Sequence, residues 1–309
     1  MTGVLLGFGV VAVIAAVGFA TAALLPGEAA RIRQGLTPVI YYITNPALML
    51  VLVAGTDLGA VLGVYTPVAL ATAAVAGAVC ALYSGLVLRR RGARTAAAAM
   101  AASYVNAGNI GLPIALYAVG SAAPVVSVLL AQLLVLAPLY LALFSLLTRS
   151  AGSGSLWRAV ARSVANPVTI GTALGVLLSA TGLELPEVLW VPLEMLGESS
   201  VPLLLLVFGM SLHGQRPFRQ RALVPDVVGA TLVKLTVMPA AAWALGRFGF
   251  GLDGTELLGV VVMAALPTAQ NVFLFSSQFR MPTAVVRDVV LLSSLLSFPA
   301  IALIGVLLA

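Results

Sequence analysis

Charged residues are scarce in this chain of 309 residues: Asp, Glu, Lys and Arg together make up 8%, whereas hydrophobic residues make up 61%. Ordinary soluble domains carry about 25% charged and about 45–50% apolar residues. Disordered chains need low hydrophobicity and high charge. The composition therefore excludes both classes and predicts an all-α polytopic membrane protein whose main partner is the lipid bilayer.

The residues that carry most enzyme chemistry are almost absent. Cys80 is the only cysteine, His213 the only histidine and Lys234 the only lysine. One cysteine excludes an internal disulfide and a thiolate metal site, and one histidine excludes an HExxH zinc site. Lys234 also lacks the GxxxxGK context of a phosphate-binding loop. The sequence therefore predicts no enzyme, no metal site and no cofactor.

Ten segments qualify as membrane spans, each of which needs about 20 mostly apolar residues. They are residues 3–25, 37–57, 66–88, 95–118, 124–147, 167–183, 189–212, 225–246, 257–279 and 283–308.

The arginines gather on one side of these ten segments. When the connections are assigned to alternate sides, 14 arginines lie on one side and only Arg247 lies on the other. Cytoplasmic loops of membrane proteins carry an excess of Lys and Arg. We therefore expect a multi-pass protein of the cell inner (plasma) membrane with both termini outside the cytoplasm. The net charge of +6 then reflects topology, and no nucleic acid partner is predicted.

The two halves of the chain resemble each other. Matched positions lie 154 to 168 residues apart: Gly3 and Gly171, Pro46 and Pro202, Pro67 and Pro225, Pro113 and Pro267, and Pro138 and Pro299. We therefore divide the chain into a first five-helix repeat (1–148), a Gly/Ser-rich cytoplasmic linker (149–166) and a second repeat (167–309). Because five is odd, the second repeat must be inverted, which is typical of secondary transporters. The alternative is that Pro and Gly are simply common in membrane helices.

The fourth segment carries the motif Asn106-Ala-Gly-Asn109-Ile-Gly-Leu-Pro113. Pro113 donates no backbone hydrogen bond and crowds the carbonyl of Asn109, so an interruption of the helix is expected here. Amide side chains are costly in lipid and should face the protein interior. Asn106 and Asn109 are therefore candidates for a binding site, or they only satisfy the interrupted backbone.

The ninth segment carries Leu266-Pro267-Thr268-Ala269-Gln270-Asn271, which predicts a second interruption. In an inverted repeat the two interrupted helices cross, and the second half of each begins near the crossing with unpaired N–H groups and a positive dipole end. Two such ends favour an anion, most simply a carboxylate. Thr268, Gln270 and Asn271 are the candidate ligand groups on this side.

Segments 2 and 7 also contain prolines near their middle, at Pro46 and Pro202. These prolines either kink the helices or unwind them. Tyr42 and Asn45, just before Pro46, are candidates to line the same cavity from the opposite side; the alternative is ordinary packing.

Three ionisable groups fall within the spans: Glu194 and Glu198 one turn apart in segment 7, and Lys234 in the middle of segment 8. Intramembrane charges are usually functional. Burial disfavours the charged forms, so Glu198 could carry a proton and Lys234 could lose one. Three interpretations stay open: the two are coupling residues for H+ or Na+, Lys234 is a fixed charge that supports the crossing, or they form a structural ion pair.

Four stretches together resemble the auxin efflux carrier family of plant and bacterial transporters: Asn106–Pro113, Pro202 followed by Leu-Leu-Leu-Leu-Val-Phe-Gly209, Lys234 before Pro239, and Leu266–Asn271. The resemblance covers nearly the whole chain. It implies ten helices in two inverted repeats, related to bile-acid/sodium symporters, that move organic anions by an elevator-like mechanism.

The resemblance also implies that crossover asparagines and prolines form the substrate site, and these match Asn109, Pro113, Pro267 and Asn271. The resemblance implies an association with auxin-like compounds and with malate or malonate among bacterial relatives, so it does not fix the substrate of this chain. The long cytoplasmic loop of the plant members is absent here.

Three hypotheses about function follow. The favoured one is a secondary carrier for a small organic anion. A passive channel or a membrane receptor is the second, and a sodium/proton antiporter is the third, although an antiporter would favour an acidic pair at the crossing. A homodimer is compatible with the small-residue pairs Gly3/Gly7 and Gly171/Gly175, which could equally pack helices within one chain.

Overall fold

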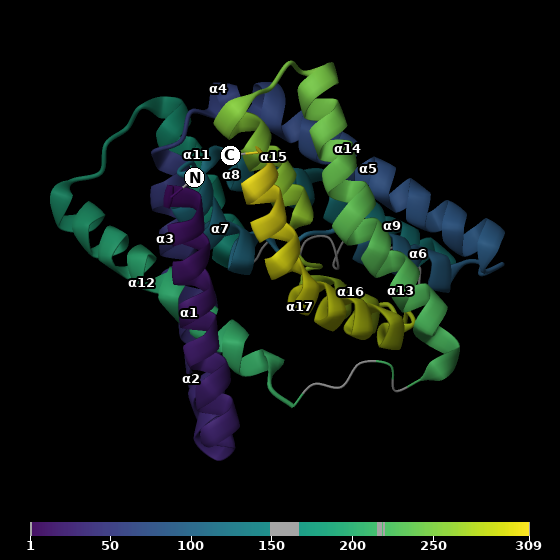
Figure 1. Cartoon of the computed structure of the whole chain (residues 1–309). Helices are drawn as coiled ribbons and strands as arrows, with labels where there is room; N and C mark the ends of the chain where they lie inside the picture. The colour runs from purple at the N-terminus through teal and green to yellow at the C-terminus, as the bar shows by residue number, and fades with distance from the viewer. Residues whose placement is uncertain (1, 149–166, 215–217, 219, 309) are drawn as a thin grey trace.

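The computed structural model describes residues 2–148, 167–214, 218 and 220–308, and these residues form helices joined by short connections (Figure 1). The predicted linker, with its arginines, lies outside the described residues. The prediction of an all-α chain is confirmed for the part of the chain that the structure describes.

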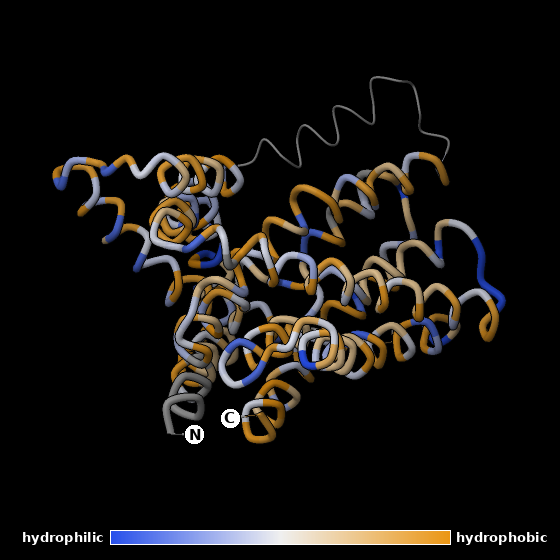
Figure 2. The backbone as a smooth tube through the Cα atoms, turned by 90° about the horizontal axis from the view of Figure 1, so that it is seen from above, coloured by the Kyte–Doolittle hydropathy of each residue, from blue (hydrophilic) through white to orange (hydrophobic). Residues whose placement is uncertain are grey.

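Within the described residues, six helices are long and apolar enough to cross a membrane: Pro26–Ala54, Val61–Val87, Ala123–Thr148, Glu187–Leu212, Arg221–Gly249 and Thr283–Leu308. Three shorter apolar helices accompany them: Ala12–Leu24, Pro167–Thr181 and Gly254–Ala265. Figure 2 shows hydrophobic residues along most of the tube, with the most hydrophilic stretches mainly at helix ends and connections. The chain is therefore a polytopic membrane protein.

The first half of the chain contains α1 (Thr2–Leu24), α2 (Pro26–Val39), η1 (Ile40–Thr44), α3 (Asn45–Ala54), α4 (Leu58–Ala60), η2 (Val61–Tyr65), α5 (Thr66–Leu82), η3 (Tyr83–Val87), α6 (Ala93–Ser103), η4 (Ala107–Gly111), α7 (Leu112–Ile114), η5 (Ala115–Val119), α8 (Ala123–Ala131), η6 (Gln132–Leu136) and α9 (Ala137–Thr148). The second half contains α11 (Pro167–Thr181), α12 (Glu187–Leu212), η7 (Arg221–Leu223), α13 (Val224–Leu232), η8 (Val233–Val237), α14 (Met238–Ala244), η9 (Leu245–Gly249), α15 (Gly254–Ala265), α16 (Asn271–Gln278) and α17 (Thr283–Leu308). The η labels mark π-type turns, except that η7 is a 3-10 turn.

Each predicted segment contains a helix, but segment 2 begins earlier than expected, at Pro26. The prediction counted only the apolar stretch, whereas Pro26 and Glu28 in the first turn favour a helix start. The mid-span prolines do not unwind their helices: α12 is continuous through Pro202, and a π-type turn precedes Pro46.

The helices form two units. The four-helix unit consists of α1, the continuous helix α2–η1–α3, α11 and α12, which pack mainly against one another. The crossing unit consists of residues 58–148 and 221–308. In Figure 1, α1, α3, α11 and α12 lie on one side of the molecule, and α5, α6, α9, α13 and α14 lie on the other. The units meet where α1 contacts η5 and α12 contacts η4.

Glycines allow close approach within the four-helix unit. A Cβ atom at Gly175 would lie 2.7 Å from the carbonyl oxygen of Leu50, and one at Gly197 would lie 2.9 Å from the Cα of Leu48. Gly171 likewise contacts Pro46. The Gly171/Gly175 pair therefore packs α11 against α3 within one chain. The side-chain surroundings of Gly3 and Gly7 lie outside the described part.

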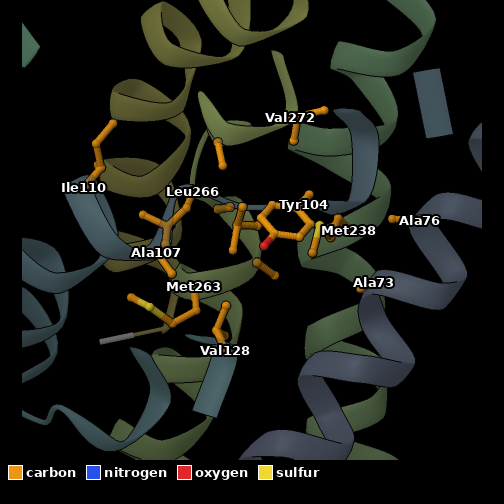
Figure 3. Close-up of a cluster of buried hydrophobic side chains, with 14 of the residues drawn as sticks. Ala73, Ala76, Tyr104, Ala107, Ile110, Val128, Met238, Met263, Leu266 and Val272 are labelled. Carbon is orange, nitrogen blue, oxygen red and sulfur yellow. The ribbon is translucent and has the colours of Figure 1, made fainter. Parts of the chain in front are cut away.

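The hydrophobic core is centred on the crossing unit, where α6 and α15 are buried along most of their length. Figure 3 shows Tyr104, Leu266, Met263 and Met238 close together within it. The run of alanines in α6 leaves little side-chain bulk, so neighbouring helices approach it closely.

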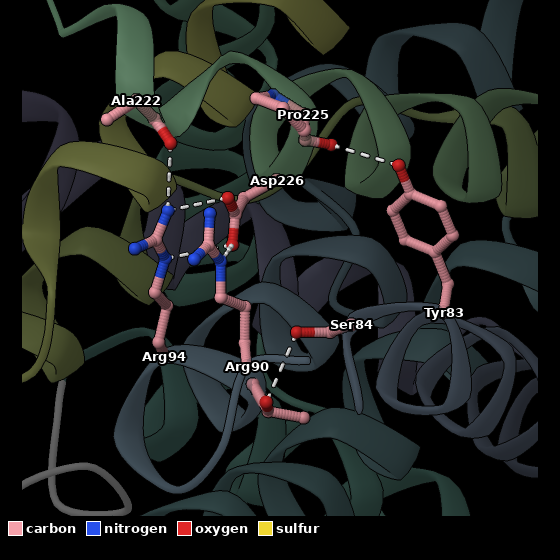
Figure 4. Close-up of polar contacts among 8 residues, drawn as sticks. Tyr83, Ser84, Arg90, Arg94, Ala222, Pro225 and Asp226 are labelled. Atoms are coloured by element: carbon pink, nitrogen blue, oxygen red, sulfur yellow. Dashed lines mark hydrogen bonds and ion pairs between the residues drawn. The ribbon is translucent and has the colours of Figure 1, made fainter. Parts of the chain in front are cut away.

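An ion-pair cluster joins the start of α6 to the start of α13 (Figure 4). Arg94 donates to both carboxylate oxygens of Asp226, at 2.9 and 2.6 Å, and Arg90 Nε lies 3.5 Å from Asp226 Oδ1. The Asp226 side chain has no exposed surface. Sequence reasoning counted both arginines only as topology signals and did not single out Asp226.

Candidate functional site

The first interruption lies between α6 and η4. Tyr104 has extended backbone angles, and helical geometry resumes at Ala107. The prediction placed the interruption at residues 106–113, which is a few residues late. Pro113 lies in the first turn of α7, where proline is tolerated. The carbonyl of Asn106 accepts from the N–H groups of both Ile110 and Gly111, which closes the π-type turn ahead of Pro113.

The second interruption lies where the sequence predicts it. The helix α15 ends at Ala265, α16 begins at Asn271, and the residues between them are non-helical. Pro267 stands in this gap. Its missing N–H and its ring both prevent the helix from continuing.

The two interruptions pair with each other. Val105 and Thr268 form an isolated antiparallel β-bridge. The N–H of Asn106 donates to the carbonyl of Pro267 at 2.8 Å, and the N–H of Ala269 donates to the carbonyl of Tyr104 at 3.1 Å. Segments more than 160 residues apart in sequence therefore satisfy each other's backbone, as non-helical chain in a membrane requires.

Side chains complete the hydrogen bonding at the crossing. Thr268 Oγ1 donates to the carbonyl of Ala101 at 2.6 Å, and Thr268 N–H donates to Ser293 Oγ at 3.0 Å. Gln132 Nε2 donates to the carbonyl of Val105 at 2.8 Å. Sequence reasoning did not name Gln132 or Ser293 as site residues. The signal was present, because the two residues lie in similar stretches ahead of the matched prolines Pro138 and Pro299, Leu-Leu-Ala-Gln-Leu-Leu (129–134) and Leu-Leu-Ser-Ser-Leu-Leu (291–296).

Two half-helices begin beside the bridge. One runs from Ala107 through η5, and the other is α16, from Asn271. The first N–H groups of a helix have no partner within it, and its N-terminal end carries a partial positive charge. The crossing therefore brings together two ends that favour a negative group.

The predicted site residues divide by exposure. Asn106, Pro113, Pro267 and Thr268 are buried, and Thr268 is fully engaged in holding the crossing. Gln270 and Asn271 are exposed at the start of α16 and are free to meet a ligand. The side chain of Asn109 lies outside the described residues.

Asn45 and Tyr42 lie in the four-helix unit rather than at the crossing. Asn45 is buried in α3, which packs mainly against α11 and α12, and its Oδ1 atom has no hydrogen-bond partner. Tyr42 is 65% exposed. The structure does not bring these two residues to the interrupted helices.

Lys234 lies in η8, in the middle of its long helix, and is fully buried. Its Nζ donates to the carbonyl of Ala264 at 2.7 Å and contacts Met238 Sδ at 3.0 Å. Glu194 and Glu198 are exposed on α12, and neither forms an ion pair with Lys234 in the described part of the chain. The interpretation of Glu198 and Lys234 as an ion pair is therefore wrong, because they belong to different units.

A small cavity lies beside the crossing, with room of about 20 Å³ for a water-sized molecule. Such a volume holds about one water. Its wall is mostly apolar and includes the polar residues Thr72, Ser127 and Gln132, together with Met238 and Ala264. Thr72 Oγ1 is buried and has no hydrogen-bond partner.

A polytopic helical chain with two interrupted, crossing helices has the architecture of a membrane transporter. Residues 155–305 match the model of a family described as "Membrane transport protein". The chain is also 28% identical over 297 residues to a Rhizobium meliloti (strain 1021) protein named "Putative malonate transporter", covering 91% of this chain and 88% of the relative. The chain is therefore similar to these membrane transporters, and the resemblance expected from the interrupted-helix motifs is confirmed.

Proposed function

We propose that the protein is a secondary carrier for a small organic anion, and that the anion binds at the crossing between the two half-helix ends. The observation that carries this proposal is the paired interruption, since it aims two positive dipole ends at one place. Gln270 and Asn271 would hydrogen-bond the anion, together with Asn109, while Asn106 and Thr268 hold the crossing in shape.

The substrate class we propose is a carboxylate, with dicarboxylates favoured over auxin-like compounds. A short dicarboxylate presents two anionic groups to two half-helix ends. The name of the Rhizobium meliloti relative supports this class. Helix ends supply the binding without a fixed positive side chain in contact with the ligand, which suits a carrier that must also release it.

We propose elevator-type alternating access between the two units. The crossing unit would move against the four-helix unit, whose glycine-mediated packing supports a rigid body. The corresponding positions of Gln132 and Ser293 at the two interruptions support two related five-helix repeats. The odd number of spans in each repeat supports their inversion within ten spans, and the excess of arginines on one side supports both termini outside the cytoplasm.

The test is malonate counterflow in proteoliposomes. Asn271→Ala and Asn109→Ala should weaken binding by about 10- to 100-fold, because a hydrogen bond to a charged group contributes about 1.5–3 kcal/mol. Ser277→Ala, an exposed change on the same half-helix, is the matched control. Unchanged counterflow in both asparagine variants would refute the site, and flux without saturation or counterflow would indicate a channel instead.

A further inference from the structure

Lys234 differs chemically from the arginines that make up the rest of the Lys and Arg residues of this chain. The sequence has 16 Lys and Arg residues, and the other 15 are arginines. A guanidinium stays charged in proteins, whereas a buried lysine can exchange a proton. His213 is the one further basic group, and it is exposed at the end of α12. Among the described residues, the only buried basic group that can release a proton therefore lies in the middle of the membrane-spanning region.

Lys234 has no fixed counter-charge. The turn η8 packs against α5, α6, α13, α14, α15 and α17. The ionisable residues of these elements and of the adjoining interruption are Cys80, Arg94, Tyr104, Asp226, Glu256, Arg287 and Asp288. Asp226 is paired with Arg94, and Asp288 with Arg287 at 2.7 Å. No carboxylate within the described residues pairs with Lys234.

Capping the helix end does not by itself call for a lysine. Lys234 donates to the carbonyl of Ala264, in the last turn of α15 before the second interruption. The corresponding carbonyl before the first interruption, that of Ala101, lies 163 residues earlier and accepts from the neutral hydroxyl of Thr268. The two matched helix ends are thus capped by different groups, a hydroxyl at Ala101 and an amine at Ala264. Only the amine can carry a positive charge.

The small cavity at the crossing shares two of its lining residues with the contacts of Lys234. Its wall includes Ala264 and Met238, the two residues that contact Nζ, and Thr72, whose buried hydroxyl has no partner. A buried water needs two or more polar partners, and this mostly apolar wall offers the side chains of Thr72, Ser127 and Gln132. The two residues that contact Nζ therefore also border a cavity with room for about one water.

We propose that Lys234 is the proton carrier of this transporter and couples one proton to each carboxylate. The neutral amine takes up a proton at Nζ from a hydronium ion on the side on which the carboxylate binds. An O–H bond breaks, an N–H bond forms, a water molecule remains, and the substrate is unchanged. The bound anion supplies the counter-charge that the resting site lacks. After the crossing unit moves, the ammonium releases the same proton to the other side as the anion leaves. This inference rests on the proposed carrier function.

The experiment uses the full chain in proteoliposomes with radiolabelled malonate. Counterflow is measured at equal pH, and net uptake is measured with the outside about one pH unit more acidic. One coupled proton then gives about tenfold extra accumulation. Lys234→Met and Lys234→Gln should abolish this tenfold gain and keep counterflow. Thr236→Val, on the exposed side of the same turn, should keep both.

The outcomes separate the two proposals. Gradient-driven accumulation that survives in both lysine variants, or that is absent from the wild type despite counterflow, overturns proton carriage by Lys234. Loss of counterflow in lysine variants that still elute as monodisperse, cooperatively unfolding protein also overturns it, because the lysine would then be part of binding or support. Absence of counterflow in the wild type refutes the carrier function itself.

Discussion

The hydroxyl of Thr268 offers the sharpest test of how the crossing is held together. It is fully buried and donates to the carbonyl of Ala101 at 2.6 Å, which is otherwise an orphan acceptor in the last turn of α6. Thr268→Val keeps the side-chain shape and removes the donor. A buried acceptor left without its partner costs about 1–3 kcal/mol. At about 2–4 °C per kcal/mol for domains of this order of size, the melting temperature should fall by about 2–12 °C.

The assay is thermal unfolding of the detergent-solubilised protein, with Thr236→Val as the control. Thr236 Oγ1 also donates to a backbone carbonyl, that of Leu232 at 2.7 Å, but it is exposed and within one helix. Its loss should change stability by less than about 0.5 kcal/mol. Thr268→Ser, which keeps the hydroxyl, should recover part of the difference. Equal melting temperatures for both valine variants would contradict the assigned role of Thr268 at the crossing.

Two further predictions concern packing and charge. Asp226→Asn should destabilise the protein by about 3 kcal/mol, because it leaves Arg94 beside an uncharged buried group. Asp253→Asn, at an exposed ion pair, should cost less than about 1 kcal/mol in the same unfolding assay. Equal effects of the two changes would contradict the argument that burial makes the Asp226 pair important. Gly197→Ala should lower the free energy of unfolding by about 1–3 kcal/mol, because the new Cβ would meet the backbone of Leu48. Gly85→Ala should cause almost no steric loss, because a Cβ there meets no neighbouring atom among the described residues. Similar losses of folded yield for the two variants would show that the close approach at Gly197 is unimportant.

Much of the fold is predictable because hydrophobic runs, arginine placement and proline spacing each report on long-range order. Pro267 predicts the position of its interruption closely, because α15 ends at Ala265. No π-type turn in the described stretch ahead of this proline accommodates it, so the helix ends there. Pro113 misleads, because the π-type turn formed around the Asn106 carbonyl lets proline start the next helical piece. That outcome depends on pairing with a segment far along the chain, which local sequence does not encode.

The site residues follow the same rule. The residue types indicated that asparagines and threonine would lie at the crossing. They did not indicate which of these residues would hold the crossing together and which would stay exposed. Thr268 forms two hydrogen bonds, one to α6 and one to α17, because it faces these two helices. Gln270 and Asn271 are exposed. Asn45, beside Pro46, was a candidate for the same cavity, with ordinary packing as the alternative. Asn45 instead packs in the four-helix unit, because Gly171 and Gly197 allow α11 and α12 to lie close against α3.

The proposed inverted symmetry would let one residue couple transport without touching the substrate. Each interrupted helix ends its first half in orphan carbonyls and begins its second half in orphan N–H groups. The N–H ends face a shared anion site in the proposed mechanism, and the carbonyl ends are capped at Ala101 and Ala264. A neutral cap at one end and a titratable cap at the other make the pair electrically asymmetric. Charge can then enter with the anion and leave with it, while the backbone hydrogen bonds of the crossing stay intact.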